Sequence, residues 1–187
     1  MKPWKTLSSQ MAFDHRWFKV RQDKVELPNG KVLDDYFVWV NGDVALVVPI
    51  TEDGNIVIVK QYKHGADEIL LELPAGFVDE GEEPLEAAQR ELAEETGYIS
   101  NAFTKLATMT NNPTKETGSM HIFLAEHSTK QRETAFDSNE EIETLVCTPQ
   151  EVLEMIEKGE FKGTVSVVGV FMALLKLGVI VTSPEKG

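Results

Sequence analysis

The stretch from Gly76 to Tyr98 constrains this chain more than any other segment, because it joins helix signals to many acidic side chains at fixed spacing. Pro84 suits the first turn of a helix, and Gly97 suits the C-terminal exit of the same helix. Apolar residues at spacings of three and four predict one apolar stripe along this helix. The stripe consists of Leu85, Ala88 and Leu92.

The same helix carries a second face of glutamates, because Glu91 lies three residues before Glu94 and four before Glu95. Like charges at these spacings oppose helix formation by roughly 0.2–0.5 kcal/mol per pair. A divalent cation would compensate directly, since Mg²⁺ takes oxygen ligands and is held by one or two carboxylates plus substrate phosphates. An ordinary solvated acidic helix is the alternative interpretation, because charged residues generally lie outside.

The complete spacing favours the metal-binding interpretation. Gly76 is followed after five residues by Glu82, and seven further residues lead to the run of residues 90–98. This order resembles the signature of the Nudix hydrolase family, Gly-x5-Glu-x7-Arg-Glu-U-x-Glu-Glu-x-Gly-U, in which U is a bulky apolar residue. The resemblance implies an α/β/α sandwich around a mixed sheet, in which the signature forms a loop, a helix and a second loop. We call residues 76–98 the Nudix signature.

The segments outside the signature predict an α+β chain with strands before and after the central helix. Two alternating runs flank Asn29 and Gly30, and this dipeptide is the strongest short hairpin signal. We therefore expect an antiparallel β-meander over residues 1–40 and a Nudix hydrolase domain over residues 41–187.

The meander contains apolar side chains that a sheet of two or three strands cannot bury by itself. These are Val25, Leu27, Val32, Phe37 and Trp39. In the resembled family, members of the ADP-ribose pyrophosphatase branch use this segment to pack against a second copy, where it contributes to the partner's substrate pocket. The resemblance therefore implies a homodimer of C₂ symmetry, the commonest closed symmetry.

Charge and cysteine content argue against several function classes. A net charge of −13, from 31 acidic and 18 basic residues, argues against a nucleic-acid-binding surface, which needs a basic patch. A phosphate substrate is still compatible with this negative charge, because a bound metal inverts the local field.

The single cysteine, Cys147, rules out an internal disulfide and is expected in a buried strand. Residues 165–181 are apolar but interrupted, by Ser166 among others, so they predict a buried helix and no membrane span. With no apolar signal region, we expect a cytoplasmic protein.

For the site, the resemblance implies a set of oxygen ligands for Mg²⁺, or for Mn²⁺ in its place. Carried over by position, Glu91 and Glu95 are the main metal ligands and catalytic residues, and Glu94 is a supporting one. The carbonyl of Ala75 resembles a main-chain metal ligand, and Gly76 permits a close backbone approach. Such a site supports hydrolysis of a diphosphate, because metal ions neutralise the pyrophosphate oxygens and lower the pKa of a bound water.

The resemblance also implies an ion pair and a base outside the helix. In the family Arg90 pairs with Glu82 and holds the loop against the helix. The base is expected on a loop before a later strand, where family members often read Glu-x-Glu-x-Ile-Glu. Here Ser138 stands at the first of these glutamates and Glu140 at the second. Glu140 is therefore the expected base and metal ligand, with Glu141 as the alternative.

The expected substrate is a nucleoside diphosphate sugar. Pro113 lies fifteen residues after Tyr98, and a proline near that place marks the ADP-ribose pyrophosphatase branch. We expect Lys63 and Gly76 near the diphosphate and Trp39 stacked on the base, with plain packing as the alternative for Trp39. Other nucleoside diphosphate sugars, such as ADP-glucose or GDP-mannose, are alternative substrates. A sensor that binds nucleotide sugars without turnover is a rival function, and the three intact glutamates argue against it.

Overall fold

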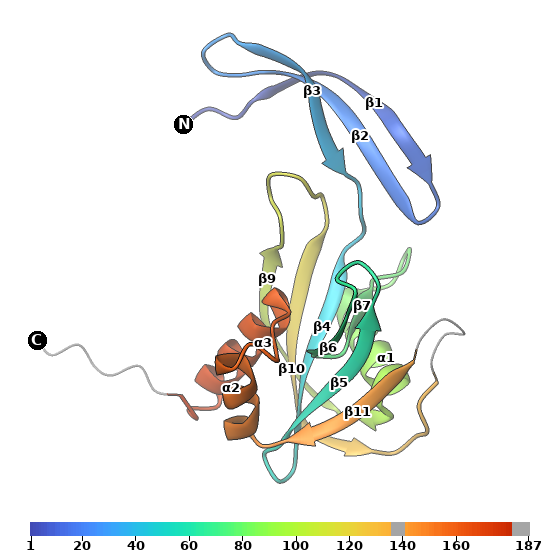
Figure 1. The fold of residues 1–187 in the computed structure, drawn as a ribbon, viewed down its shortest axis with the longest axis vertical. Coiled ribbons are helices and arrows are strands. Elements are labelled where there is room, and N and C mark those ends of the chain that lie inside the picture. Colours follow the sequence, from blue (N-terminus) through green and yellow to red (C-terminus); the bar gives the residue numbers. More distant parts are fainter. Residues whose placement is uncertain (136–140, 181–187) are drawn as a thin grey trace, which may run out of the picture. The chain divides into compact units, whose positions relative to one another are not determined.

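The computed structural model describes residues 1–135 and 141–180, which are drawn in colour in Figure 1. The chain divides into two compact units. The first, which we call the N-terminal unit, comprises residues 1–43 together with residues 110–119. The second, the core unit, comprises residues 44–109 and the described residues from 120 onward. A loop from the middle of the chain therefore folds with the N-terminus.

The N-terminal unit is built on a three-stranded antiparallel sheet. Its strands are β1 (Lys5–His15), β2 (Phe18–Glu26) and β3 (Val32–Trp39), paired in the order β1-β2-β3. The turn between β2 and β3 contains Asn29 and Gly30, and Gly30 has a φ of 83°, which an L side chain rarely adopts. The expected hairpin and antiparallel meander are confirmed.

The loop of residues 110–119 is hydrogen-bonded along the end of β3. The Trp39 N–H donates to the Lys115 carbonyl over 2.7 Å, and the Tyr36 hydroxyl donates to the Thr114 carbonyl over 2.6 Å. The Lys115 ammonium also lies 4.3 Å from the centroid of the Tyr36 ring, a cation–π geometry. These contacts explain why the loop folds as part of the N-terminal unit.

The core unit contains a mixed sheet whose described strands number eight. They are β4 (Val44–Thr51), β5 (Ile56–Lys63), β6 (Glu68–Glu72), β7 (Ala75–Phe77), β8 (Tyr98–Ile99), β9 (Ala102–Thr110), β10 (Ser119–Lys130) and β11 (Ile142–Cys147). The central path runs β11-β5-β4-β10-β8, while β6, β7 and β9 pair with β5, β4 and β10 respectively (Figure 1). The β4 and β10 strands are parallel, whereas β5 is antiparallel to β4, β6 and β11. The helices are α1 (Pro84–Thr96), α2 (Pro149–Glu157) and α3 (Thr164–Lys176).

Strand β4 forms the centre of the core, because its side chains alternate between two buried faces. Ala45 and Val47 belong to one apolar cluster, which includes the buried side of α1. Leu46 and Val48 belong to the other cluster, which includes apolar residues of α2 and α3. Helices therefore cover both faces of the sheet, and the expected α/β/α sandwich is confirmed.

Expectations about individual buried residues have mixed outcomes. Ala88 and Leu92 are buried as the apolar stripe predicts, but Leu85 is 40% exposed and Ala87 is buried in its place. The prediction is wrong at Leu85 because spacing alone does not locate the edge of the helix face that meets the sheet. Cys147 is buried in β11 as expected, and burial raises the pKa of its thiol.

The apolar run of residues 165–181 forms α3, which begins at Thr164 and ends at Lys176. Val170, Ala173 and Leu174 are fully buried, so the expected buried helix is confirmed. Within the described part of the chain, no helix has both the length and the apolar character needed to cross a membrane.

Candidate active site

Helix α1 presents the Nudix signature with both of its ends fixed. Pro84 occupies the first turn, and the Glu83 N–H donates to the Glu86 carboxylate over 3.1 Å. At the other end Gly97 has a φ of 72°, and its N–H donates to the Ala93 carbonyl over 3.0 Å. The helix start and stop that the sequence predicts are confirmed.

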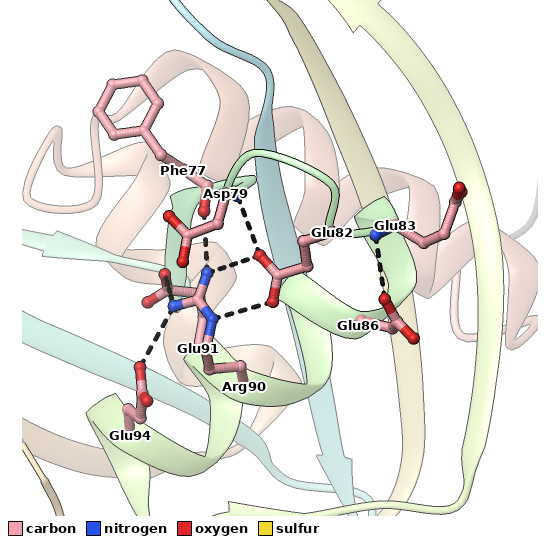
Figure 2. Close-up of polar contacts among 8 residues, drawn as sticks. All are labelled: Phe77, Asp79, Glu82, Glu83, Glu86, Arg90, Glu91 and Glu94. Atoms are coloured by element: carbon pink, nitrogen blue, oxygen red, sulfur yellow. Dashed lines mark hydrogen bonds and ion pairs between the residues drawn. The ribbon is translucent and has the colours of Figure 1, made fainter.

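Figure 2 shows Arg90 among the carboxylates of the signature. Its guanidinium donates two hydrogen bonds of 3.0 Å to the Glu82 carboxylate, one from Nε and one from Nη2. The Nη2 atom also donates to the Phe77 carbonyl over 2.9 Å. The Nη1 atom donates to Glu91 over 2.6 Å and to Glu94 over 3.2 Å. The expected pair with Glu82 is present, and the same guanidinium binds two of the expected metal ligands.

The positive charge of Arg90 favours the ionised form of the Glu82 carboxylate. Hydrogen bonds from Arg90 hold the pKa of Glu82 below its usual range, although partial burial opposes this effect, and the Asp79 N–H adds a bond of 3.0 Å. The pKa of Arg90 is raised in turn, chiefly by Glu82. Repulsion among the glutamates, which the sequence suggested a metal would relieve, is therefore partly relieved by a side chain of the same helix.

Strand β7 lies against the helix face that carries Glu91 and Glu95. A Cβ atom at Gly76 would lie 1.9 Å from Oε1 of Glu91, so only glycine leaves room for that carboxylate. The Ala75 N–H donates to Oε2 of Glu95 over 3.1 Å. Glu95 is 5% exposed, which places a carboxylate in a nearly solvent-free position beside the strand. The close approach expected at Gly76 therefore brings the β7 backbone against a carboxylate of α1.

The oxygen donors of this face fit a hard divalent cation. Glu91, Glu94 and Glu95 offer carboxylates within one turn of α1, and Gly76 leaves space for the first of them. Among residues 1–135 and 141–180, no three His, Cys, Asp or Glu side chains are already gathered into a metal-binding group. Substrate phosphates commonly complete the coordination of Mg²⁺.

The expected substrate-binding residues fall in both units. Trp39 and Pro113 both belong to the N-terminal unit, because the loop that contains Pro113 is bonded to β3. Trp39 stacks on Phe18 with ring centroids 5.4 Å apart, which is the packing role that was its alternative. Lys63 and Gly76 both belong to the core unit. The Lys63 ammonium lies 3.5 Å from a carboxylate oxygen of Glu72 in β6.

The expected base, Glu140, lies outside the described residues. Its alternative, Glu141, is exposed immediately before β11. The described chain on either side is attached to the end of α1. The Ala135 N–H donates to the backbone carbonyl of Glu94 over 2.9 Å. The Thr144 hydroxyl donates to the backbone carbonyl of Glu95 over 3.3 Å.

Sequence reasoning missed one buried hydroxyl that bonds the entrance to the signature. Ser166 of α3 accepts the Leu73 N–H over 3.1 Å, two residues before β7 begins. The available signal was a polar residue inside an apolar run, which by itself indicates only that the run does not span a membrane.

Two family models match adjoining parts of the chain, which together cover residues 4–165. Residues 40–165 match the model described as the NUDIX domain. Residues 4–39 match the model described as the nucleoside diphosphate sugar hydrolase N-terminal domain.

Similar proteins of known name cover most of the chain. An ADP-ribose pyrophosphatase of Bacillus subtilis (strain 168) is 34% identical over 157 residues, which are 83% of this chain and 84% of the relative. A methanol dehydrogenase activator of Bacillus methanolicus is 32% identical over 167 residues, or 89% of this chain and 90% of the relative. A solved structure described as an ADP compounds hydrolase superposes with a TM-score of 0.85 at 24% identity. That superposition covers 96% of this chain and 98% of the other, and it shows a shared fold.

Proposed function

This chain belongs to the Nudix hydrolase family, and we propose that it hydrolyses the diphosphate of ADP-ribose or a related nucleoside diphosphate sugar. The products would be a nucleoside monophosphate and a sugar phosphate, or AMP and ribose 5-phosphate from ADP-ribose. The observation that carries the proposal is the Nudix signature folded against β7, with Glu91 filling the space that Gly76 leaves. The name of the Bacillus subtilis relative supports the substrate class.

The proposed reaction needs a water, a base and neutralised phosphate oxygens. Mg²⁺, or Mn²⁺ in its place, would supply charge neutralisation and a more acidic water when bound. Glu91 and Glu95 would provide its main carboxylate ligands, with Glu94 and the Ala75 carbonyl in support. The water oxygen forms a bond to one phosphorus while the bond from that phosphorus to the bridging oxygen breaks. Glu140, or else Glu141, would take the proton from the water.

Arg90 has a positioning role in this proposal. It binds Glu91 and Glu94 on one side and the loop residue Glu82 on the other. Because the guanidinium is a planar fork, it holds these carboxylates in fixed directions. The chain therefore orients its acidic face before substrate arrives.

A homodimer is part of the proposal, because the N-terminal sheet exposes large apolar side chains. The large apolar side chains of the N-terminal unit that are more than two-fifths exposed are Met1, Trp4, Leu7, Met11, Phe13, Trp17, Phe18, Val32 and Phe37. A sheet of three strands needs a packing partner for such a surface. We propose that a second copy of this chain covers it, and that residues of this unit, Pro113 among them, contribute to substrate recognition. We also propose a cytoplasmic location, which agrees with a single, buried thiol at Cys147.

A substrate panel tests the proposal directly. Purified protein with Mg²⁺ is given ADP-ribose, ADP-glucose, GDP-mannose and ATP, and the nucleotide products are separated and quantified. We expect ADP-ribose to give AMP at the highest kcat/KM. Preference for another sugar would revise the substrate, and binding without any product would favour the sensor function. A preference for ATP would contradict the proposal.

A further inference from the structure

The corner between β6 and β7 delivers the chain to the Nudix signature. It consists of Leu73 and Pro74, since β6 ends at Glu72 and β7 begins at Ala75. Proline has no N–H, so the donors at this corner are the N–H groups of Leu73 and Ala75. The Pro74 carbonyl accepts the Val47 N–H of the central strand over 3.0 Å. Whatever fixes these two N–H groups therefore fixes the direction in which β7 starts.

Each of the two N–H groups is bound by a side chain from a different helix. The Leu73 N–H donates to Oγ of Ser166 on α3 over 3.1 Å. The Ala75 N–H donates to Oε2 of Glu95 on α1 over 3.1 Å. Ser166 is 4% exposed and Glu95 is 5% exposed, so water does not readily replace either acceptor. The helices α3 and α1 pack on opposite faces of the sheet, so the corner is bound from both sides.

Close packing fixes the position of Ser166. One turn further along α3, a Cβ at Gly169 would lie 3.0 Å from side-chain atoms of both Leu46 and Leu73. The helix therefore contacts the same corner residue with its backbone at Gly169 and with its hydroxyl at Ser166. A serine at this site is held where its oxygen meets the Leu73 N–H.

We infer that Ser166 is a positioning residue for the metal-binding face. By fixing the Leu73 N–H, it sets the orientation of the next peptides, so that Ala75 presents its N–H to Glu95. Loss of the hydroxyl leaves the Leu73 N–H without this acceptor, and the corner must rotate or admit water. Either change alters the position of the Glu95 carboxylate, as happens when an outer partner of a metal ligand is removed. The inference rests on the proposed function, because it takes Glu95 as a ligand.

The test compares two buried serines whose hydroxyl oxygens accept different backbone N–H groups. Ser166→Ala removes the acceptor at the corner. Ser100→Ala is the matched control, because Ser100 is also buried and its oxygen accepts the Ala102 N–H over 2.9 Å, so the backbone group that it binds lies outside the corner. Ser166→Cys keeps a polar atom at the γ position, but sulfur is larger than oxygen and is a weaker acceptor. Each purified full-length variant is titrated with Mn²⁺ without substrate, and free Mn²⁺ is measured by electron paramagnetic resonance. The Mg²⁺ concentration for half-maximal turnover is then measured.

We expect Ser166→Ala to bind Mn²⁺ about tenfold more weakly, within the range seen when outer partners of metal ligands are removed. The Mg²⁺ midpoint should rise by a similar factor while KM for substrate at saturating Mg²⁺ stays near the wild-type value. Ser166→Cys should show a smaller shift in the same direction, and it keeps the test open if Ser166→Ala does not fold. Ser100→Ala should lower the melting temperature and leave Mn²⁺ binding unchanged.

Two failures are distinguishable. If the wild-type protein binds Mn²⁺ and turns over substrate, but both Ser166 variants bind Mn²⁺ like wild type, the positioning role is wrong and the proposed function stands. Equal weakening by Ser100→Ala would also overturn the role, since the effect would then follow general stability. If the wild-type protein neither binds Mn²⁺ nor hydrolyses any diphosphate on the panel, the proposed function itself fails.

Discussion

Strands β4 and β2 are both flanked on two sides by other strands, but only β4 is covered on both faces. Every residue of β4 from Ala45 to Ile50 is buried, because helices of the core unit pack on both faces of its sheet. In β2, by contrast, only Asp23 and Val25 are buried. One of these two is a charged residue. The core unit thus closes its own interior, whereas the N-terminal sheet leaves large apolar side chains exposed.

This difference separates the roles of the two units. A closed core holds the Nudix signature at fixed distances, which the proposed chemistry requires. An uncovered sheet offers a surface for association, which a second copy of the chain would bury. We therefore expect substitutions in the core unit to affect turnover and metal binding, and substitutions on the N-terminal sheet to affect association.

The largest expected effect is the loss of turnover when a carboxylate of the core unit is neutralised. Glu95→Gln should lower kcat on the order of a thousandfold, as when a group that stabilises transition-state charge is removed. The fold should persist, because the amide oxygen of glutamine still accepts the Ala75 N–H. Glu94→Gln is the control and should lower kcat by a smaller factor, since the Glu94 side chain is 45% exposed. Steady-state kinetics with circular dichroism checks both. Activity like wild type for Glu95→Gln at saturating Mg²⁺ would remove Glu95 from the proposed site.

The next effect concerns association through the N-terminal sheet. Phe13→Glu places a charge on a side chain that is 54% exposed, and it should weaken a dimer roughly 10–100-fold, the equivalent of losing one buried aromatic side chain. Ile69→Glu is the control, because Ile69 is 64% exposed in the core unit and should leave association unchanged. Light scattering over a concentration series gives the mass. A wild-type mass of one chain, or equal effects from both variants, would refute an association surface limited to the N-terminal unit.

A smaller effect separates two arginines that bind carboxylates in different units. Arg90→Met should lower the free energy of unfolding by about 1–3 kcal/mol, because it leaves partly buried carboxylates without their donor. Arg21→Met should cost less, about 1 kcal/mol, because the buried Asp23 carboxylate keeps the Ser9 hydroxyl as a donor over 2.6 Å. Only Arg90→Met should also weaken Mn²⁺ binding, since Arg21 contacts Asp23 of its own sheet. Urea denaturation with Mn²⁺ titration tests the pair, and equal loss of metal binding in both would break the separation of roles.

The smallest effect is a pH dependence that belongs to the N-terminal sheet. Burial opposes ionisation of Asp23, but bonds from Arg21 and Ser9 outweigh it and hold the pKa of Asp23 below its ordinary 3.8. A carboxyl with a lowered pKa stabilises the fold at pH values above its ordinary pKa, and this contribution is lost as pH falls through the folded pKa. Acid unfolding below about pH 4 should therefore be less steep in Asp23→Asn than in wild type. Identical acid transitions in wild type and Asp23→Asn would mean that the bonds from Arg21 and Ser9 to Asp23 do not stabilise the fold.

Local signals predicted the parts of the site that lie close together in sequence. Pro84 and Gly97 marked the ends of α1, and Asn29 with Gly30 marked a hairpin, because turn and cap geometry depends on a few neighbouring residues. The pair of Arg90 with Glu82 followed from the family resemblance. Its further bonds did not, since spacing does not tell which of several nearby carboxylates one guanidinium reaches.

Contacts between distant segments were beyond prediction from a single sequence. The bond from Leu73 to Ser166 spans 93 residues, and the bond from Tyr36 to Thr114 spans 78. Such pairs depend on how segments that are distant in the sequence pack together, and their residue types follow no spacing that would predict the contact. Leu85 shows the same limit on a smaller scale, because a helix stripe has an edge that only its packing partner defines.

The bonding of residues 110–119 to β3 affects how this protein could be recombined with its relatives. The backbone passes between the two units at residues 43–44, 109–110 and 119–120. A chimera that exchanges residues 1–43 alone would join a foreign sheet to a native loop. The foreign strand would then have to donate to the Lys115 and Thr114 carbonyls from the positions of Trp39 and Tyr36. The exchangeable segment is therefore discontinuous, and both pieces must be exchanged together to keep these hydrogen bonds.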